Sequence, residues 1–168
     1  MTVYTTMNNP LGELLLVGEA APEGGTVLTS LSFPGQSGAP VVQAGWRRDD
    51  AAFFEAAGQL EDYFAGRLRE FDLHCASNGT PFQEKVWAAL ETVPYGTTTT
   101  YGALAERVGL ARSAARAVGA ALGANPLLVL RPCHRVLSSG GALTGYAAGL
   151  QRKAALLAGE GVRQNAAA

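Results

Sequence analysis

The spacing of hydrophobic residues changes along the first half of the chain, and this change restricts the fold more than any other feature of the sequence. Turn-forming residues at 8–10 and 24–25 separate short apolar runs at 14–17 and 27–33, which predicts two or three antiparallel strands. From Asp49 onward the apolar residues recur at helical intervals, which predicts one amphipathic helix. A small antiparallel sheet followed by helices places the chain in the α+β class.

A small, polar segment at 75–79 predicts a boundary between an N-terminal domain of residues 1–76 and a C-terminal domain of residues 77–168. The second domain is predicted to be mostly helical. Its first helix is indicated by residues 80–83, where a capping threonine precedes a proline and a glutamine stands three residues after the cap.

Two further short helices are predicted at 101–108 and 114–123, and the tight turn between them makes a candidate helix-turn-helix. The outward face of the second helix carries Arg116 and otherwise small residues such as Gly119 and Ala120. Small side chains allow a helix to come close to the narrow minor groove of DNA. An alanine-rich helix packed tightly on its neighbour has the same pattern, so this face alone does not decide between the two.

The charge of the chain is distributed unevenly. Residues 1–78 carry four Lys/Arg against ten Asp/Glu, a net charge of −6, whereas residues 79–168 carry nine against four, a net charge of +5. A polyanion is therefore expected to prefer the C-terminal half, although the total of −1 is not that of a strongly basic protein. Ordinary variation of surface charge between domains gives the same numbers, so charge alone does not establish DNA binding.

The N-terminus, the cysteines and the histidines indicate where the protein is located and whether it binds zinc. The N-terminus lacks the basic and apolar regions of an export signal, and no apolar run approaches the roughly 18 residues of a membrane span. These features predict a cytoplasmic protein without membrane contact, whose two cysteines are free thiols. Two histidines are too few for the usual four-ligand zinc spacing, so no zinc site is expected.

Cys133 is the candidate nucleophile. It follows an apolar run at 127–130, which predicts a buried strand, and His134 is adjacent to it between Arg131 and Arg135. Positive neighbours and an imidazole are expected to lower the pKa of the thiol and to favour the reactive thiolate. A core cysteine is the alternative. Since neighbours in an extended chain point to opposite faces, coupling between the thiol and His134 is expected to need a bridging water.

Around this cysteine the sequence resembles the O6-alkylguanine-DNA alkyltransferase family, bacterial type. Residues 131–136 contain the Pro-Cys-His-Arg-Val signature of that family, and other matching stretches stand in its order and spacing over nearly all of residues 79–168: 79–83, 86–87, 94–96, 114–119, 125–126 and 145–146. Residues 1–78 match loosely, with Pro10-Leu11-Gly12 similar to bacterial members. The resemblance implies an RNase H-like N-terminal support domain and a winged-helix-like C-terminal domain.

The resemblance implies direct-reversal DNA repair, in which an alkyl group moves from O6-alkylguanine, or also O4-alkylthymine, to Cys133 once and irreversibly. This chemistry is expected to need neither a metal nor a cofactor. A monomer would bind double-stranded DNA in the minor groove and flip the damaged base out of the stack. By likeness, Arg116 fills the gap left in the stack, and Tyr101 rotates the nucleotide and protonates the departing guanine. The implied DNA-contacting residues are Tyr101, Ala115, Arg116, Ala117, Gly119 and Ala120.

The resemblance also implies roles for the residues around the thiol. Glu160 would orient His134, which acts through a water on Cys133, and Asn125 would brace the turn before the cysteine. The implied substrate pocket comprises Val136, Tyr146, Ala147 and Lys153, where Val136 offers a carbonyl to the guanine edge and Ala147 an N–H to O6.

Two other functions remain open. A hydrolase triad of Cys133, His134 and Glu160 predicts catalytic turnover. A lesion-binding relative without alkyl transfer is the other alternative, although such relatives lack the cysteine.

Two features of the sequence depart from the family pattern. Arg131 stands where the family usually has an aliphatic residue. His74 and Cys75 are similar to the zinc ligands of certain members but lack partners, and an ordinary buried pair is expected.

Overall fold

The N-terminal half forms a four-stranded sheet. The computed structural model describes residues 1–163 and has strands β1 (Thr2–Asn9), β2 (Gly12–Ala20), β3 (Thr26–Ser32) and β4 (Arg47–Arg48) in the order β3-β2-β1-β4. The first three strands pair antiparallel, as predicted, and the short β4 adds to β1 in parallel. The hairpin between β1 and β2 closes at Gly12, whose φ of 125° favours glycine.

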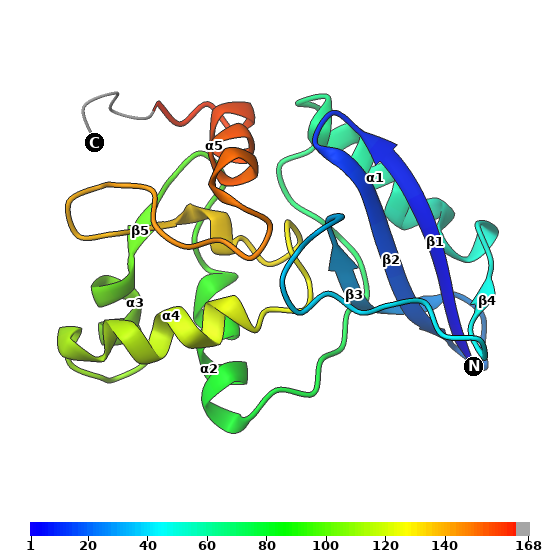
Figure 1. Ribbon diagram of the computed structural model, residues 1–168, viewed down its shortest axis with the longest axis horizontal. Coiled ribbons are helices and arrows are strands. Elements are labelled where there is room, and N and C mark those ends of the chain that lie inside the picture. Colours follow the sequence, from blue (N-terminus) through cyan, green and yellow to red (C-terminus); the bar gives the residue numbers. More distant parts are fainter. Residues whose placement is uncertain (164–168) are drawn as a thin grey trace.

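One helix covers this sheet (Figure 1). A 3₁₀ turn at Ala51–Phe53 leads into α1 (Phe54–Phe64), which buries Leu60 and Tyr63. The helix ends before Gly66, whose φ of 80° lies in the left-handed region that glycine adopts without strain. The predicted amphipathic helix is therefore confirmed.

The C-terminal half is mostly helical, and its first helix begins where the capping signal predicts. In α2 (Pro81–Leu90) the Thr80 hydroxyl accepts a hydrogen bond from the Gln83 N–H at 3.1 Å, and the Gln83 side chain accepts one from the Thr80 N–H at 3.0 Å. The candidate helix-turn-helix consists of α3 (Tyr101–Arg107) and α4 (Ala115–Gly123). The remaining elements are β5 (Thr99–Thr100), β6 (Val136–Leu137) and α5 (Leu150–Gly159).

The predicted strand at 127–130 is wrong. This segment is a tight turn, in which the Leu130 N–H donates to the Leu128 carbonyl at 2.8 Å and the Arg131 N–H donates to the Leu127 carbonyl at 2.9 Å. Val129 has a φ of 71°, which is strained for a β-branched residue. Four consecutive apolar residues are compatible with any buried backbone, so the sequence could not distinguish this turn from a strand.

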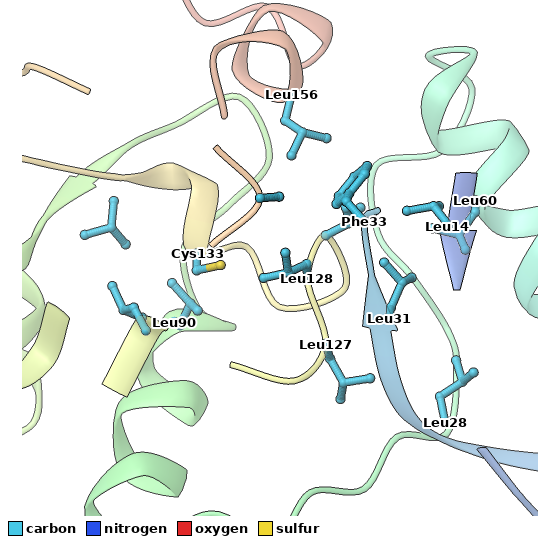
Figure 2. Packing of buried hydrophobic residues seen from close by; sticks show 14 of the residues in the cluster. Leu14, Leu28, Leu31, Phe33, Leu60, Leu90, Leu127, Leu128, Cys133 and Leu156 are labelled. Atoms are coloured by element: carbon cyan, nitrogen blue, oxygen red, sulfur yellow. The ribbon is translucent and has the colours of Figure 1, made fainter. Parts of the chain in front are cut away.

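A single cluster of buried hydrophobic residues extends through both halves (Figure 2). Leu31 and Phe33 from the sheet side belong to the same cluster as Leu128, Leu156 and Cys133 from the C-terminal half. The backbone also connects the halves, because the Leu31 N–H donates to the Pro126 carbonyl at 2.9 Å. The turn that precedes Cys133 therefore packs directly against β3. Within residues 1–163, no helix is both long and apolar enough to cross a membrane.

Candidate active site

Cys133 lines a cavity in the C-terminal half. The volume of this cavity is about 480 Å³, within the range of about 300–1,000 Å³ that is typical of small-molecule sites. The sulfur-bearing residue is only 5% exposed. The walls come from the start of α3, one side of α4 and the loop at 144–147, with the lining residues Tyr101, Ala115, Arg116, Gly119, Leu122, Gly123, Cys133, Thr144, Gly145, Tyr146 and Ala147.

Seven of the predicted residues meet in this lining, namely Cys133, Tyr101, Ala115, Arg116, Gly119, Tyr146 and Ala147. Two predicted DNA-contacting residues, Ala117 and Ala120, lie outside the cavity but are exposed on the same helix, α4. Val136 is fully buried in β6 and does not line the cavity. Arg116 is exposed at the rim formed by α4, where a polyanion can reach it.

Asn125 connects the thiol to the turn that precedes it. Its side-chain amide donates to the Cys133 Sγ at 3.3 Å and to the Arg131 carbonyl at 3.3 Å, while its Oδ1 accepts from the Leu127 N–H at 3.0 Å. Asn125 is buried, so these contacts satisfy polar groups that water does not reach. A single side chain thus contacts both ends of the turn and the thiol of Cys133.

The expectation that the flanking arginines lower the pKa of Cys133 is wrong. Burial raises the pKa of this thiol to about 11, and the hydrogen bond from Asn125 and the charge of Lys153 offset only part of the effect. Arg131 instead contacts Ser77 at 2.8 Å and stacks over Trp87, and Arg135 binds Glu160. Adjacency in sequence did not place either guanidinium beside the sulfur.

His134 is held by a buried carboxylate rather than by the thiol. Its Nε2 lies 2.7 Å from Glu160 Oε2, and within residues 1–163 its buried Nδ1 has no protein partner. Burial lowers the pKa of His134, which keeps the ring neutral and able to accept a proton. Burial alone would raise the pKa of Glu160, but hydrogen bonds from His134, Arg135 and Tyr63 bring it to about 2. The predicted pair of Glu160 and His134 is therefore in contact.

Two side chains anchor the loop that forms the far wall. The Tyr101 hydroxyl donates to the Thr144 carbonyl at 2.6 Å, and the Lys153 ammonium donates to the carbonyls of Thr144 and Gly145 at 2.9 and 3.1 Å. Burial lowers the pKa of Lys153 to about 8 and raises the pKa of Tyr101. Tyr101 therefore keeps its proton at neutral pH, as a proton donor must.

The structure adds Tyr63 to the residues that the sequence indicated and gives Arg135 a different partner from the one expected. Tyr63 of α1 donates to Glu160 Oε2 at 2.5 Å, and Arg135 donates to both oxygens of the same carboxylate at 2.7 and 3.0 Å. The helical pattern of α1 gives no sign that Tyr63 reaches the other half of the chain. His74 and Cys75 are exposed rather than a buried pair. Over the described part of the chain, no group of three or more His, Cys, Asp or Glu could hold a metal.

Comparison with known proteins assigns the family. The 6-O-methylguanine DNA methyltransferase ribonuclease-like domain matches residues 2–76, and the 6-O-methylguanine DNA methyltransferase DNA binding domain matches residues 81–162. The methylated-DNA–protein-cysteine methyltransferase of Mycobacterium tuberculosis (strain H37Rv) is 47% identical over 157 residues, which are 94% of this chain and 91% of that protein. The chain belongs to this methyltransferase family.

Other members are similar along nearly their whole length. The methylated-DNA–protein-cysteine methyltransferase of Methanosarcina acetivorans is 44% identical, over 94% of this chain and 97% of that protein. The crystal structure of Mycobacterium tuberculosis OGT in complex with DNA superposes with a TM-score of 0.85 at 46% identity, and covers 94% of this chain and 92% of that one. The α+β fold of this methyltransferase family member is therefore shared by a relative solved with DNA.

Proposed function

We propose that this protein repairs DNA by direct reversal, moving the alkyl group of O6-alkylguanine to Cys133 once and irreversibly. The observation that carries the proposal is the position of Cys133, which lines a cavity walled by the two helices of the helix-turn-helix. The names of the methyltransferase relatives and of the OGT–DNA complex support it. A base flipped from the duplex could enter this cavity from the α4 side.

The geometry supports a displacement at a saturated carbon. A bond forms between the Cys133 sulfur and the alkyl carbon as the bond from that carbon to O6 breaks, and the electron pair stays on the guanine. Tyr101, which holds its proton, supplies a proton to the guanine and is reprotonated from solvent. The thiol proton passes to His134, which acts through a water and is held by Glu160.

The pocket residues complete this proposal. Asn125 keeps the sulfur in place, Tyr146 forms part of the wall, and Lys153 holds the loop that presents the backbone N–H of Ala147 to O6. The side chain of Val136 is buried outside the cavity, and the proposed contact with the guanine edge is made by its backbone carbonyl, which follows the short 3₁₀ helix of Cys133. The resulting thioether has no easy route back, so each molecule reacts once.

The DNA-facing surface is proposed to be α4 in the minor groove. Arg116 is exposed there among small residues, including Ala117 and Ala120, so the helix can approach the groove closely. Arg116 then fills the gap that the flipped base leaves. A monomer located in the cytoplasm remains our prediction.

The test is transfer to a defined duplex. The protein is incubated with an oligonucleotide duplex containing one O6-methylguanine, and the Cys133 peptide is weighed by mass spectrometry. We expect the wild type to gain one methyl group per molecule and Cys133→Ser to gain none. The control Cys75→Ser should gain one methyl group as the wild type does, because Cys75 is exposed and lies outside the cavity. Turnover without a stable adduct would favour a hydrolase, and binding without an adduct a lesion-binding protein; either result overturns the proposal.

A further inference from the structure

Tyr63 connects the N-terminal half to the carboxylate that holds His134. It lies in α1, is 5% exposed, and donates its hydroxyl hydrogen to Glu160 Oε2 across 97 residues of sequence. Its ring is fixed by aromatic neighbours, with centroids 5.3 Å from Phe64, 5.2 Å from Phe71 and 6.2 Å from Tyr95. A packed ring of this kind can hold its hydroxyl group in one place.

The hydrogen bonds to Glu160 are concentrated on one oxygen of the carboxylate. Oε2 accepts from Tyr63 at 2.5 Å, from His134 at 2.7 Å and from Arg135 Nη2 at 3.0 Å, while Oε1 accepts from Arg135 Nε at 2.7 Å. A carboxylate oxygen offers about two acceptor positions, so the three donors on Oε2 share that oxygen, whereas Oε1 accepts only one. The oxygen that orients His134 is the same oxygen that Tyr63 holds. Loss of the Tyr63 hydroxyl therefore acts on the bond to the imidazole directly.

We propose that Tyr63 is a positioning residue for alkyl transfer, by which the N-terminal half fixes Glu160 and, through Glu160, the ring of His134. The inference rests on the proposed function of the site. It gives the N-terminal half a part in the chemistry, because a hydroxyl group from α1 completes the hydrogen-bond network that holds His134, the neighbour of Cys133 in the chain. Tyr63 itself does not line the substrate cavity.

The expected direction of the effect follows from competition for one oxygen. Without the Tyr63 hydroxyl, Oε2 carries more negative charge and accepts more strongly from His134, which stabilises the protonated ring. The other groups that act on the ring stay in place: Arg135 and Lys153 oppose its protonation. Further titratable or charged groups near the network are Cys133, Tyr146, Tyr95 and Arg152. The pKa of His134 is therefore expected to rise in Tyr63→Phe.

The experiment compares two tyrosines of the same cluster. Tyr63→Phe removes the hydroxyl group from Glu160 and keeps the ring, whereas Tyr95→Phe removes a hydroxyl group that donates to the backbone carbonyl of Gly159, at 3.2 Å, and to no side chain of the network. Single-turnover transfer from the O6-methylguanine duplex is measured from pH 5.5 to 8.5. In parallel, NMR of ¹⁵N-histidine-labelled protein follows the titration of the ring, which is simple because the chain has only two histidines.

We expect Tyr63→Phe to transfer the methyl group at least threefold more slowly than the wild type at neutral pH. The acidic limb of its pH–rate profile and the titration of His134 should both move to higher pH. Tyr95→Phe should match the wild type in transfer rate and in the titration of His134. If Tyr63→Phe has the transfer rate and the His134 titration of the wild type, the inference is overturned. Equal slowing in both variants without movement of the His134 titration also overturns it, since packing then explains the loss. If wild-type protein forms no adduct, the proposed function fails, and the titration still tests the link between Tyr63 and His134.

Discussion

Replacement of Glu160 by Gln tests whether the buried carboxylate is an anion that stabilises the fold. Glu160 is 5% exposed and binds Arg135 through both oxygens. The substitution Glu160→Gln keeps the size of the side chain but leaves the guanidinium of Arg135, which is also buried, without its counter-charge. Removal of one partner from a buried ion pair costs about 3–5 kcal/mol.

The pKa of Glu160 gives an independent magnitude and a pH window. The pKa falls from an ordinary 4.5 to about 2 in the folded protein, which at about 1.4 kcal/mol per unit is worth about 3 kcal/mol. Because the folded pKa lies below the unfolded one, this stabilisation is complete above about pH 5 and is lost as the pH falls toward 2. By pH 3 about 2 kcal/mol of it has gone.

Glu160→Gln should therefore be about 3 kcal/mol less stable than the wild type at pH 7, and the difference should shrink to about 1 kcal/mol at pH 3. The measurement is urea unfolding at pH 7, 5, 4 and 3, followed by tryptophan fluorescence. Burial also lowers the pKa of His134, so the stability that the neutral ring contributes to the folded state is lost as the pH falls below about 6.5. Glu160 partly opposes this lowering through its hydrogen bond and its charge, so Glu160→Gln lowers the pKa of His134 further, and the comparison is therefore made in a His134→Gln background, where the difference between the two proteins reports the carboxylate.

Asp62→Asn is the matched control, because Asp62 pairs with Arg67 on the surface, where the two side chains are 48% and 67% exposed. An exposed pair of this kind contributes at most about 1 kcal/mol. A gap between wild type and Glu160→Gln that stays constant from pH 7 to pH 3 would refute the reasoning. So would a Glu160→Gln protein as stable at pH 7 as the Asp62→Asn control.

Three further predictions concern other parts of the molecule. Since the pKa of buried Lys153 is lowered to about 8 from 10.5, the unfolded chain binds more protons between these values, and the stability of the wild type relative to Lys153→Met should rise by about 2 kcal/mol from pH 7.5 to 9.5 in urea unfolding. The difference is measured because the raised pKa of Cys133 lowers the stability of both proteins over the same range. Gly79→Ala should lower stability by about 1–3 kcal/mol in thermal unfolding, because its Cβ would lie 2.4 Å from the Trp87 ring; an unchanged melting temperature would show that the ring moves freely. Arg116→Ala should weaken binding to an O6-methylguanine duplex about tenfold or more in fluorescence anisotropy, without a change in melting temperature, and an unchanged affinity would exclude Arg116 from the interface.

The elements that could be predicted from the sequence are those specified by neighbouring residues. The capping box of α2 needs only Thr80 and Gln83, and both hydrogen bonds are present. The two helices of the helix-turn-helix follow from apolar spacing and from the glycines that end them. The contact between His134 and Glu160 was implied by the family resemblance alone, since 26 residues separate them.

The features that could not be predicted depend on contacts between distant segments. The turn at 127–130 forms because Asn125 and the edge of β3 supply its backbone partners, and Val129 accepts a strained φ of 71° there. Ser77 and Trp87 set the orientation of the Arg131 side chain, and Glu160 sets that of the Arg135 side chain. None of these partners is near its arginine in the sequence. Local pattern therefore indicated Cys133 as the candidate nucleophile but not the electrostatic environment of its thiol.

The same distant contacts explain why the N-terminal half belongs to the site. Leu31 pairs its backbone with the turn before Cys133, and Tyr63 holds the carboxylate behind His134. Arg152 adds a third connection, since it donates to the carbonyl of Leu11 at 2.9 Å and to that of Ala148, beside the cavity wall, at 3.2 Å. Each connection begins in the sheet or in α1 and ends on a different segment around the sulfur. A weakened contact between the halves should therefore disturb the turn before Cys133, the ring of His134 and the pocket wall together. This holds even though no residue of the N-terminal half lines the cavity.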